Sequence, residues 1–430
     1  MKLFNIKGIL FEKNQLEKAT ENSETISLPL PEKVTIPLYD CNALVKKGDN
    51  VFRGQKIGEN SEKFPVFSSV SGEITDIKEI TLPDKIKTKA VEIKTDGLQT
   101  NFVGISSPEI TDKASFIDAL KNSGCREPDG TPSYSLFNGE FSTIIISPDE
   151  NEPYITSDYR CLVEDAEKIS EGIEILKKYL QPEKIIIGIN HENSDEFQLF
   201  KEKFSGDTQI NVKYLKSTYP QCEKKILVYN LADKNTTEND VAVMDISSVA
   251  FISDYIKTGI PFIDKRVTVD GDIVKTPCNV LVPVGTSVKD VLTFAETNFE
   301  FVEKIVSRGT MKGNCVENYE SPVCITDNSV LAFKTPIETG KLKEAVASTN
   351  CFNCGRCTES CPENLFPARI EKAFDKKNLK RLEKLNVNSC INCGNCTYIC
   401  PARHNLAEKI LQAKEFIRNS ANDEKEKGEE

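Results

Sequence analysis

The chain has 430 residues, 15 cysteines, only two histidines and a formal net charge of −11 at pH 7. Nucleic-acid binding needs clustered Lys and Arg, so this charge and the shortage of basic runs exclude that class of partner. No apolar run has the length of a signal-peptide core near the start or of a membrane span elsewhere, which predicts a cytoplasmic protein, at most peripheral to a membrane.

Residues 1–27 are polar and lack periodicity, so we interpret them as an N-terminal arm. Residues 28–100 alternate apolar positions with turn signals, which is typical of short paired strands. The strings KxGDxVxxGQ from Lys46 and SxVSGxI from Ser68 resemble the hairpin corners of lipoyl/biotinyl-like barrel-sandwich hybrid domains. Because no lysine has the acidic or methionine neighbours of a prosthetic-group carrier, we interpret this domain as a docking or scaffolding unit.

Residues 101–262 alternate helical periodicity with buried apolar runs. This alternation predicts a Rossmann-like α/β unit with a mostly parallel sheet, which binds ligands at the carboxyl ends of its strands. The predicted helices are Ala114–Ser123, Val163–Leu180, Phe197–Phe204 and Val249–Thr258, and the predicted strands are Thr143–Ile146, Lys184–Ile189, Ile226–Leu231 and Val241–Met244.

The rest of the chain divides into four parts. Residues 263–300 are β-rich, contain a helix capped by Ser287 and resemble the soluble-ligand-binding β-grasp (SLBB) module. Residues 301–340 show no pattern and are interpreted as an irregular connection. Residues 341–418 contain most of the cysteines, and the charged residues 419–430 are expected to be disordered. The predicted fold class is therefore multidomain α/β and β, with a helical domain near the carboxyl end.

Eight cysteines lie in two copies of the pattern CxxCxxCxxxCP. This is the spacing of bacterial two-cluster iron-sulfur domains, in which the fourth cysteine of each copy binds the other copy's cluster. Gly355 and Gly394, one in each copy, allow the backbone to turn tightly. The spacing predicts one 4Fe-4S cluster on Cys351, Cys354, Cys357 and Cys400, and a second on Cys390, Cys393, Cys396 and Cys361.

Zinc and disulfides are the alternatives for these cysteines. Zinc sites typically pair two CxxC knuckles, whereas here four cysteines recur twice with identical spacing. Disulfide frameworks belong to small secreted chains. An α-helical ferredoxin domain with two 4Fe-4S clusters fits the pattern best, and it predicts that the protein transfers electrons.

Several strings outside the cysteine region occur in the order typical of one family. They are Glu150-Asn151-Glu152-Pro153-Tyr154-Ile155-Thr156, then Asp158 and Arg160, then Tyr219-Pro220-Gln221 before Glu223-Lys224, then Arg266–Gly271 and Pro283–Thr286. Together with the cysteine copies, they resemble the RnfC protein of the Rnf ferredoxin:NAD oxidoreductase family over nearly the whole chain. The resemblance implies a domain that binds flavin mononucleotide (FMN) and NADH, with Glu150 and Glu152 at that site.

The loop that binds flavin phosphate in this family differs here. The family's GxGGAGFPT loop corresponds to residues 124–132, where Gly124 and Gly130 remain. Glu127 and Asp129 bring negative charge beside the expected phosphate, and Pro128 removes one amide donor. These changes argue against the standard FMN and NADH site, although Glu150 and Glu152 are present.

The altered loop favours a specialised branch of the family, the proline-reductase-associated electron transfer proteins (PrdC) of anaerobes. In that branch, Cys125 beside Arg126 is a candidate redox thiol with a lowered pKa, and a packed thiol without function is the alternative.

Three functions follow from these observations. The preferred hypothesis is an iron-sulfur relay that passes electrons, from NADH or another donor, to a soluble reductase such as D-proline reductase. The second is an RnfC subunit that binds FMN and NADH and works with the other subunits of a membrane-associated Rnf complex. The third is a docking scaffold in which the clusters only stabilise the fold.

Overall fold

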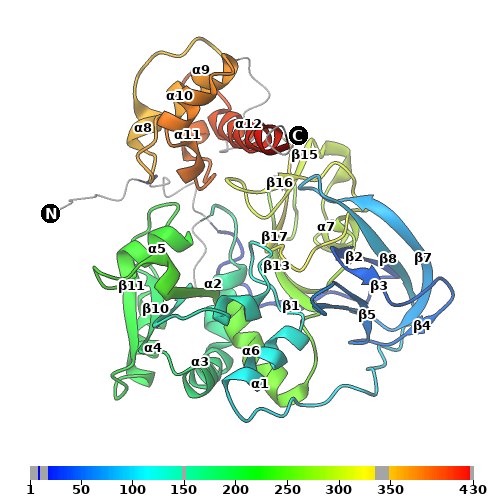
Figure 1. Ribbon diagram of the computed structural model, residues 1–430. Coiled ribbons are helices and arrows are strands. Elements are labelled where there is room, and N and C mark those ends of the chain that lie inside the picture. Colours follow the sequence, from blue (N-terminus) through cyan, green and yellow to red (C-terminus); the bar gives the residue numbers. More distant parts are fainter. Residues whose placement is uncertain (1–7, 10–17, 148–151, 335–347, 427–430) are drawn as a thin grey trace.

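The computed structural model describes residues 8–9, 18–147, 152–334 and 348–426. A sandwich domain, an α/β unit and a mixed sheet form one body, and a helical domain from the carboxyl-terminal part of the chain lies on top of it (Figure 1). No helix within these described residues is long and apolar enough to cross a membrane.

The sandwich domain is built from two small antiparallel sheets. One sheet has the strand order β2-β8-β7-β4 and the other has the order β3-β5-β6. Apolar residues such as Val34, Ile36 and Ile74 fill the space between the sheets and are fully or almost fully buried. The strands are β2 (Lys33–Tyr39), β3 (Asn42–Ala43), β4 (Asn50–Val51), β5 (Lys56–Glu59), β6 (Pro65–Phe67), β7 (Gly72–Thr81) and β8 (Lys87–Thr95).

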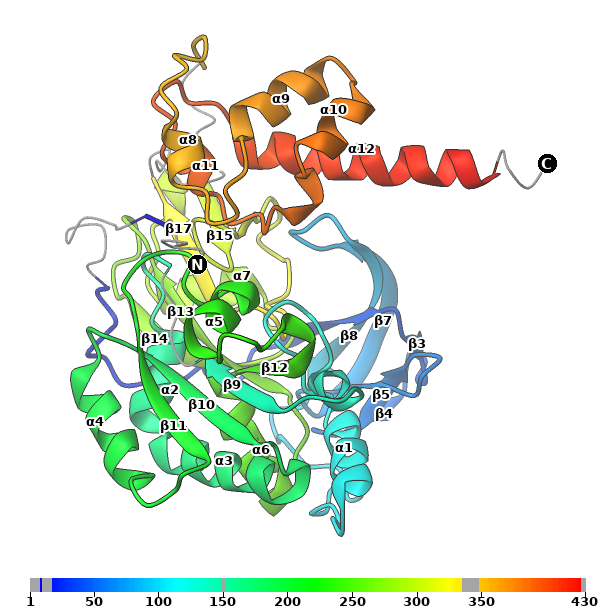
Figure 2. The same ribbon diagram turned by 60° about the vertical axis from the view of Figure 1, so that its left-hand side comes forward.

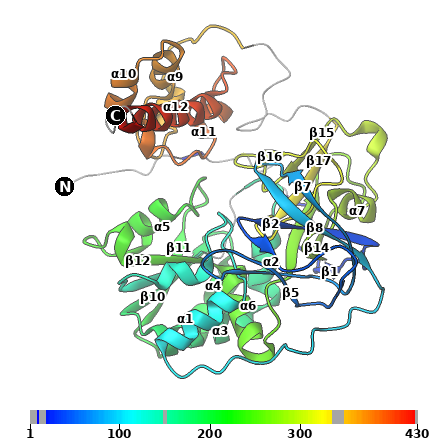
Figure 3. The same cartoon turned by 45° about the vertical axis from the view of Figure 1, so that its right-hand side comes forward.

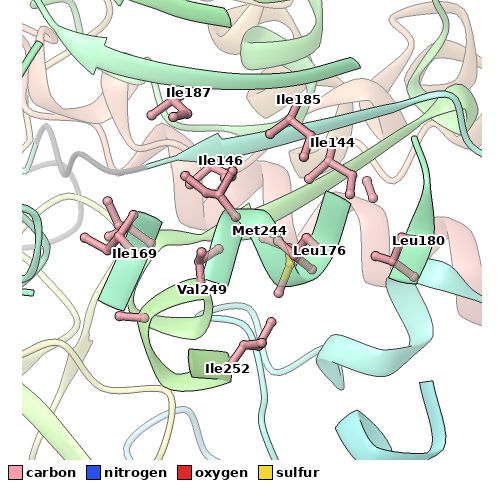
Figure 4. Packing of buried hydrophobic residues seen from close by; sticks show 14 of the residues in the cluster. Ile144, Ile146, Ile169, Leu176, Leu180, Ile185, Ile187, Met244, Val249 and Ile252 are labelled. Carbon is pink, nitrogen blue, oxygen red and sulfur yellow. The ribbon is translucent and has the colours of Figure 1, made fainter. Parts of the chain in front are cut away.

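The α/β unit has a four-stranded parallel sheet with the order β11-β10-β9-β12. Successive side chains of a strand point to opposite faces. Thus Ile144 and Ile146 pack against α3 and α6, whereas Ile145 packs with residues of α5 (Figure 4). The strands are β9 (Thr143–Ser147), β10 (Lys184–Asn190), β11 (Ile210–Leu215) and β12 (Val241–Asp245); the helices are α1 (Lys113–Asn122), η2 (Ser133–Phe137), α2 (Ser157–Glu164), α3 (Ala166–Leu180), α4 (Ser194–Lys203), α5 (Lys224–Leu231), η3 (Glu238–Asp240) and α6 (Ile246–Thr258).

Two predicted elements of this unit are wrong. Residues Ile226–Leu231 form helix α5 instead of a strand. In the structure Tyr229 and Asn230 are exposed between buried positions, which is a helical pattern. An apolar run this short does not distinguish a helix from a strand in the sequence. The predicted helix Val163–Leu180 is divided at Asp165, whose side chain pairs with Arg266 at 2.7 Å.

A six-stranded mixed sheet with the order β1-β14-β13-β17-β15-β16 completes the body. Strand β13 pairs antiparallel with β14 and parallel with β17. Ser287 caps α7 as predicted, accepting a hydrogen bond from the backbone N–H of Asp290 at 3.0 Å. The elements are β1 (Ile26–Ser27), β13 (Asp264–Asp270), β14 (Cys278–Pro283), α7 (Val288–Phe294), η4 (Phe299–Phe301), β15 (Lys304–Ser307), β16 (Asn314–Cys315) and β17 (Ser329–Phe333).

This sheet corrects two boundaries. Residues 301–340 were expected to be irregular, but they supply three of the six strands. Residues 1–27 were expected to be a peripheral arm, but β1 joins the edge of the sheet, and Thr20 is fully buried with its hydroxyl 2.6 Å from that of Thr156. Both pairings involve residues far apart in the sequence, so local periodicity does not show them.

The helical domain contains short helices around the cysteines and one long closing helix. Its core joins α9 to α12 through residues such as Ile370, Leu382 and Ile410. Helix α12 extends beyond the body in Figure 2 and reaches Glu426. Residues 419–426, which were expected to be disordered, are therefore helical. The helices are α8 (Arg356–Glu359), α9 (Pro367–Asp375), α10 (Leu379–Lys384), η5 (Val387–Ser389), α11 (Asn395–Tyr398) and α12 (Leu406–Glu426).

Candidate iron-sulfur centre

The eight motif cysteines form two groups of four, and each group combines both copies of the motif. An outer quartet, Cys351, Cys354, Cys357 and Cys400, lines a cavity of about 340 Å³. An inner quartet, Cys361, Cys390, Cys393 and Cys396, lines a smaller hollow. The fold therefore brings together the cysteines that the spacing assigns to each cluster, with the fourth cysteine of each copy in the other copy's group.

The two copies have the same backbone conformation. In the first copy Asn353 and Gly355 have positive φ angles of 53° and 78°, and in the second Asn392 and Gly394 have 53° and 81°. Each glycine precedes a short helix, α8 or α11. Asparagine and glycine are the residues that enter this left-handed region at least cost. The sequence therefore sets two equivalent loops that turn their cysteines around a common centre.

Backbone amides around the inner quartet are directed at sulfur. The N–H of Leu365 donates to Cys361 Sγ at 3.4 Å, and the N–H of Asn392 donates to Cys390 Sγ at 3.3 Å. Such donors stabilise the negative charge of cluster thiolates. Burial raises the pKa of Cys361 and Cys390, so their thiols stay protonated until iron displaces the proton. The donor set fits an iron-sulfur cluster.

The crossed grouping favours iron-sulfur clusters over zinc. A structural zinc site typically pairs two CxxC knuckles around one ion. Here each quartet takes three cysteines from one copy of the motif and one from the other, which is the ligand pattern of two-cluster iron-sulfur domains.

The inner quartet faces the body of the protein. Tyr219 Oη donates to the carbonyl oxygen of Cys393 at 2.8 Å, and Ile9 and Met311 pack in the same apolar cluster as Cys393. Lys225 of α5 pairs with Glu363 at 2.5 Å. Figure 3 shows the helical domain above the part of the α/β unit that carries α5. These contacts hold the inner quartet at the junction of the two parts.

Glu152 belongs to the same junction. Its carboxylate is buried and accepts hydrogen bonds from the backbone N–H groups of Met311, at 2.9 Å, and Lys312, at 3.1 Å. The ammonium group of Lys312 binds Glu223, and Cys393 is among the groups that raise its pKa despite the opposing effect of burial. The structure thus places Glu152, expected at a flavin site, in a network that positions the half-exposed Lys312 cation near the inner quartet. Glu150 lies outside the described residues.

The loop at residues 124–132 is closed by its own hydrogen bonds. Its backbone N–H groups at Glu127, Gly130 and Thr131 donate to acceptors within the loop at 2.8 Å each. Gly124 and Gly130 have positive φ angles of 72° and 90°. With these amides engaged, the loop does not offer the set of free donors that a flavin phosphate requires.

The Glu127 side chain is buried and held by hydrogen bonds inside the protein. It is 5% exposed, accepts from the Ser133 hydroxyl at 2.6 Å, and accepts from the backbone N–H of Asp245 at 2.8 Å, where β12 ends and α6 begins. Burial, together with the nearby Asp245 carboxylate, raises the pKa of Glu127 to about 8. A carboxyl group of the chain thus occupies a helix amino terminus at the carboxyl edge of the parallel sheet, and the loop does not fit FMN phosphate.

Cys125 differs from the expected reactive thiol. It is fully buried, and burial followed by the nearby Glu127 raises its pKa to about 12. The Arg126 guanidinium, expected beside it, lies 4.5 Å from the centre of the Phe64 ring and donates to the carbonyl oxygen of Gly130 at 2.9 Å. The geometry argues against a lowered pKa and against ready disulfide exchange at Cys125.

Three family models match separate parts of the chain. The RnfC barrel sandwich hybrid domain matches residues 6–98, the Nuo51 FMN-binding domain matches residues 129–252, and a 4Fe-4S dicluster domain matches residues 344–416. The match to the FMN-binding domain begins inside the altered loop. The α/β unit is thus of the FMN-binding type, although its phosphate loop has changed.

Two curated relatives, both RnfC proteins, cover most of the chain. The one from the proton-translocating ferredoxin:NAD(+) oxidoreductase complex of Clostridium ljungdahlii is 29% identical and covers 82% of this chain and 81% of its own length. The one from the Na(+)-translocating complex of Acetobacterium woodii is 28% identical and covers 96% and 98%. The chain is a relative of the RnfC subunits.

The comparisons correct the preferred hypothesis for this RnfC-like chain. Both relatives are named as subunits of ferredoxin:NAD(+) oxidoreductase complexes and neither as a partner of proline reductase, so the Rnf alternative is favoured. A solved NAD+-reducing [NiFe]-hydrogenase is similar at 14% identity and a TM-score of 0.49, covering 70% of this chain and 61% of that one, which is too distant to bear on function.

Sequence reasoning missed the residues that join the helical domain to the body. Tyr219 lies in one of the family strings, but its contact with Cys393 was not foreseen, and Met311 and Lys312 lie in no motif. All three meet Cys393 only through the tertiary fold. His404 also lines the outer cavity, and its ring nitrogens lie 2.9 Å from a Glu371 oxygen and 2.8 Å from the Thr349 carbonyl oxygen. Although burial opposes it, these two acceptors raise the pKa of His404.

Proposed function

We propose that this RnfC-like chain is an electron-transfer subunit of an Rnf-type assembly and carries one 4Fe-4S cluster on each quartet. The observation that supports this proposal most strongly is that the fold gathers the eight cysteines into the two crossed quartets. When bound, the clusters supply one-electron transfer. The protein's part is to hold the thiolates, donate amide hydrogen bonds to sulfur, and keep water from the inner quartet.

The two quartets have different surroundings, which suits a relay. Cys361, Cys393 and Cys396 of the inner quartet are buried against the body, whereas Cys354 of the outer quartet is exposed. Electrons therefore have a solvent-facing end and a body-facing end within one domain. The proposal contains no flavin step, because the amides of the altered loop donate to acceptors within the loop and Glu127 is buried beside them.

The remaining domains supply docking surfaces in this proposal. The mixed sheet has the strand order of a β-grasp fold, with a first hairpin (β13 and β14), a helix (α7) and a last strand (β17) that pairs parallel with the first. This order supports the SLBB interpretation. We place the protein at the cytoplasmic face of a membrane, bound to other subunits, by analogy with the ion-translocating complexes of its relatives.

An anaerobic redox titration followed by electron paramagnetic resonance (EPR) tests this proposal. We expect about eight irons per chain and two reversible one-electron signals after cluster reconstitution. Reversible reduction distinguishes a relay from a scaffold with structural clusters, which would show no exchange with low-potential donors. Zinc in place of iron, or clusters that cannot be reduced without loss, would refute the proposal. Flavin analysis of the same sample shows whether FMN binds despite the altered loop.

A further inference from the structure

The turn between α9 and α10, together with the solvent side of α10, forms a basic surface. Five basic side chains lie within nine consecutive residues there, and all five are exposed. They are Lys376, Lys377, Lys380, Arg381 and Lys384. We call this set the α9–α10 basic surface. It stands out because the chain as a whole carries a net charge of −11.

The helix geometry directs this surface away from the rest of the protein. Leu382 of α10 is fully buried in the core of the helical domain. Since successive residues of an α-helix are rotated by about 100°, Lys380 and Lys384 lie on the opposite side of α10 from Leu382, with Arg381 beside them. Figures 1 and 2 show α9 and α10 on the side of the helical domain that is far from the body. The cations are therefore open to a large partner.

The charges of this surface are not neutralised by nearby carboxylates. Asp375 pairs with Lys409 of α12 at 3.0 Å, which leaves Glu383 as the one other carboxylate in the stretch from residue 375 to residue 384. Within the described part of the chain, none of the five basic side chains forms an ion pair. Lys377 Nζ lies 4.0 Å from the centre of the Phe374 ring, a contact that orients the ammonium group without cancelling its charge. The surface thus keeps a net positive charge.

The composition of the surface fits a lipid membrane better than a protein partner. Protein interfaces are depleted of lysine and have an apolar or aromatic centre. Here four of the five cations are lysines, and between residues 367 and 420 no large hydrophobic side chain is exposed. Clusters of about four to eight Lys and Arg side chains are typical of surfaces that attract anionic lipid headgroups.

We propose that the α9–α10 basic surface binds the anionic phosphate headgroups of a membrane and holds the helical domain against the lipid. This inference rests on the proposed function, which supplies the membrane, and it adds a direct lipid contact to the contacts with other subunits. The rest of this acidic chain is repelled by an anionic surface. The contact therefore also sets the orientation of the protein, with the helical domain toward the lipid and the body away from it.

Co-sedimentation of the reconstituted chain with lipid vesicles tests this contact. The parental chain should bind vesicles of equal parts phosphatidylglycerol and phosphatidylcholine, and it should not bind phosphatidylcholine alone. At low ionic strength we expect Lys380→Glu/Lys384→Glu to lower the partition coefficient by about tenfold or more. Lys380→Gln/Lys384→Gln, which adds no negative charge to α10, should give an intermediate loss. Raising the salt concentration should largely remove these differences, because exposed charges are screened.

The control variant Lys87→Glu/Lys89→Glu makes the same charge change at exposed positions of β8 in the sandwich domain and should bind like the parent. The lipid contact is refuted if the parental chain ignores the anionic vesicles, if both α10 variants bind like the parent, or if the control variant is weakened equally. Binding of polyglutamate without binding of vesicles would assign the surface to an acidic protein and refute the lipid contact as well.

Reduction by dithionite keeps this test separate from the proposed function. If the clusters of the parental chain are reversibly reduced while the vesicles are not bound, only the lipid contact is refuted. If the vesicles are bound but the clusters cannot be reduced, the proposed electron transfer is refuted and the lipid contact stands.

Discussion

Buried carboxyl groups in this RnfC-like chain act as internal partners for the backbone. Glu152 accepts from two amides of the segment after β15, and Glu127 accepts at the start of α6. An unpaired buried charge costs several kcal/mol, so each carboxyl group has to be satisfied where it lies. Glu152, which the family resemblance assigns to a flavin site, is therefore paired with backbone amides of the protein itself.

Glu127 predicts a specific pH dependence of stability. Its folded pKa, about 8, lies above the ordinary value of 4.5, so the folded state keeps a proton that the unfolded state loses between these values. Stability should therefore fall as pH rises from 5 to 8, by at most about 1.4 kcal/mol per pH unit. Because Glu127→Gln lacks this titration, thermal melts should show the variant gaining stability relative to the parent over that range. A difference that does not change with pH would contradict this assignment.

Lys312 predicts a shift of one cluster potential. Its ammonium group lies near the inner quartet and stabilises added negative charge, so it favours the reduced form of the inner cluster. Lys312→Met should lower the inner cluster's midpoint potential and leave the outer one unchanged, and Lys312→Arg should restore most of the difference. EPR-monitored titration measures both values. Equal shifts of both clusters, or no shift, would show that Lys312 has only a packing role.

At the scale of elements, the segment after β15 joins three parts of the protein. Gly309 has a φ of +90°, and a Cβ there would lie 1.9 Å from Glu152 Oε2. The glycine thus allows the backbone to approach the carboxylate that accepts from Met311 and Lys312. This contact sets where Lys312 lies relative to the inner quartet.

Gly309→Ala should therefore destabilise the protein by roughly 2–4 kcal/mol and loosen the contact between the helical domain and the body. Gly206→Ala is a matched control, because a Cβ at Gly206 meets no atom within 4 Å. Thermal unfolding and limited proteolysis measure both effects. If the two variants behave alike, the close approach of Gly309 to Glu152 does not matter for stability.

Elements defined by local pattern could be predicted from the sequence. The cysteine spacing predicted both quartets, and the alternation of helices and strands predicted a parallel sheet with β9, β10 and β12. Strand β11 was not predicted, α5 was predicted as a strand, and the helix break at Asp165 was missed. Strands β15 and β17 could not be predicted, because they are short and gain stability only by pairing with each other and with β13. The role of Glu152 was hidden for the same reason, since its partners lie about 160 residues later.

At the scale of the whole molecule, the helical domain has one quartet toward the body and one toward solvent. Tyr219, Lys225 and Met311 fix the inner side through a hydrogen bond, an ion pair and apolar packing. The crossed ligand pattern binds the two motif copies to each other, because each cluster takes a cysteine from both. Loss of one crossing cysteine should therefore disturb the cluster of the other copy.

The most direct test of the account compares EPR spectra of single Cys→Ser variants. Cys361→Ser should perturb the same signal as Cys393→Ser, and Cys400→Ser should perturb the same signal as Cys354→Ser. This result would establish two 4Fe-4S clusters on crossed quartets. If Cys361→Ser instead perturbs the signal affected by Cys354→Ser, or if the parental protein binds zinc and gives no signal, the central claim is contradicted.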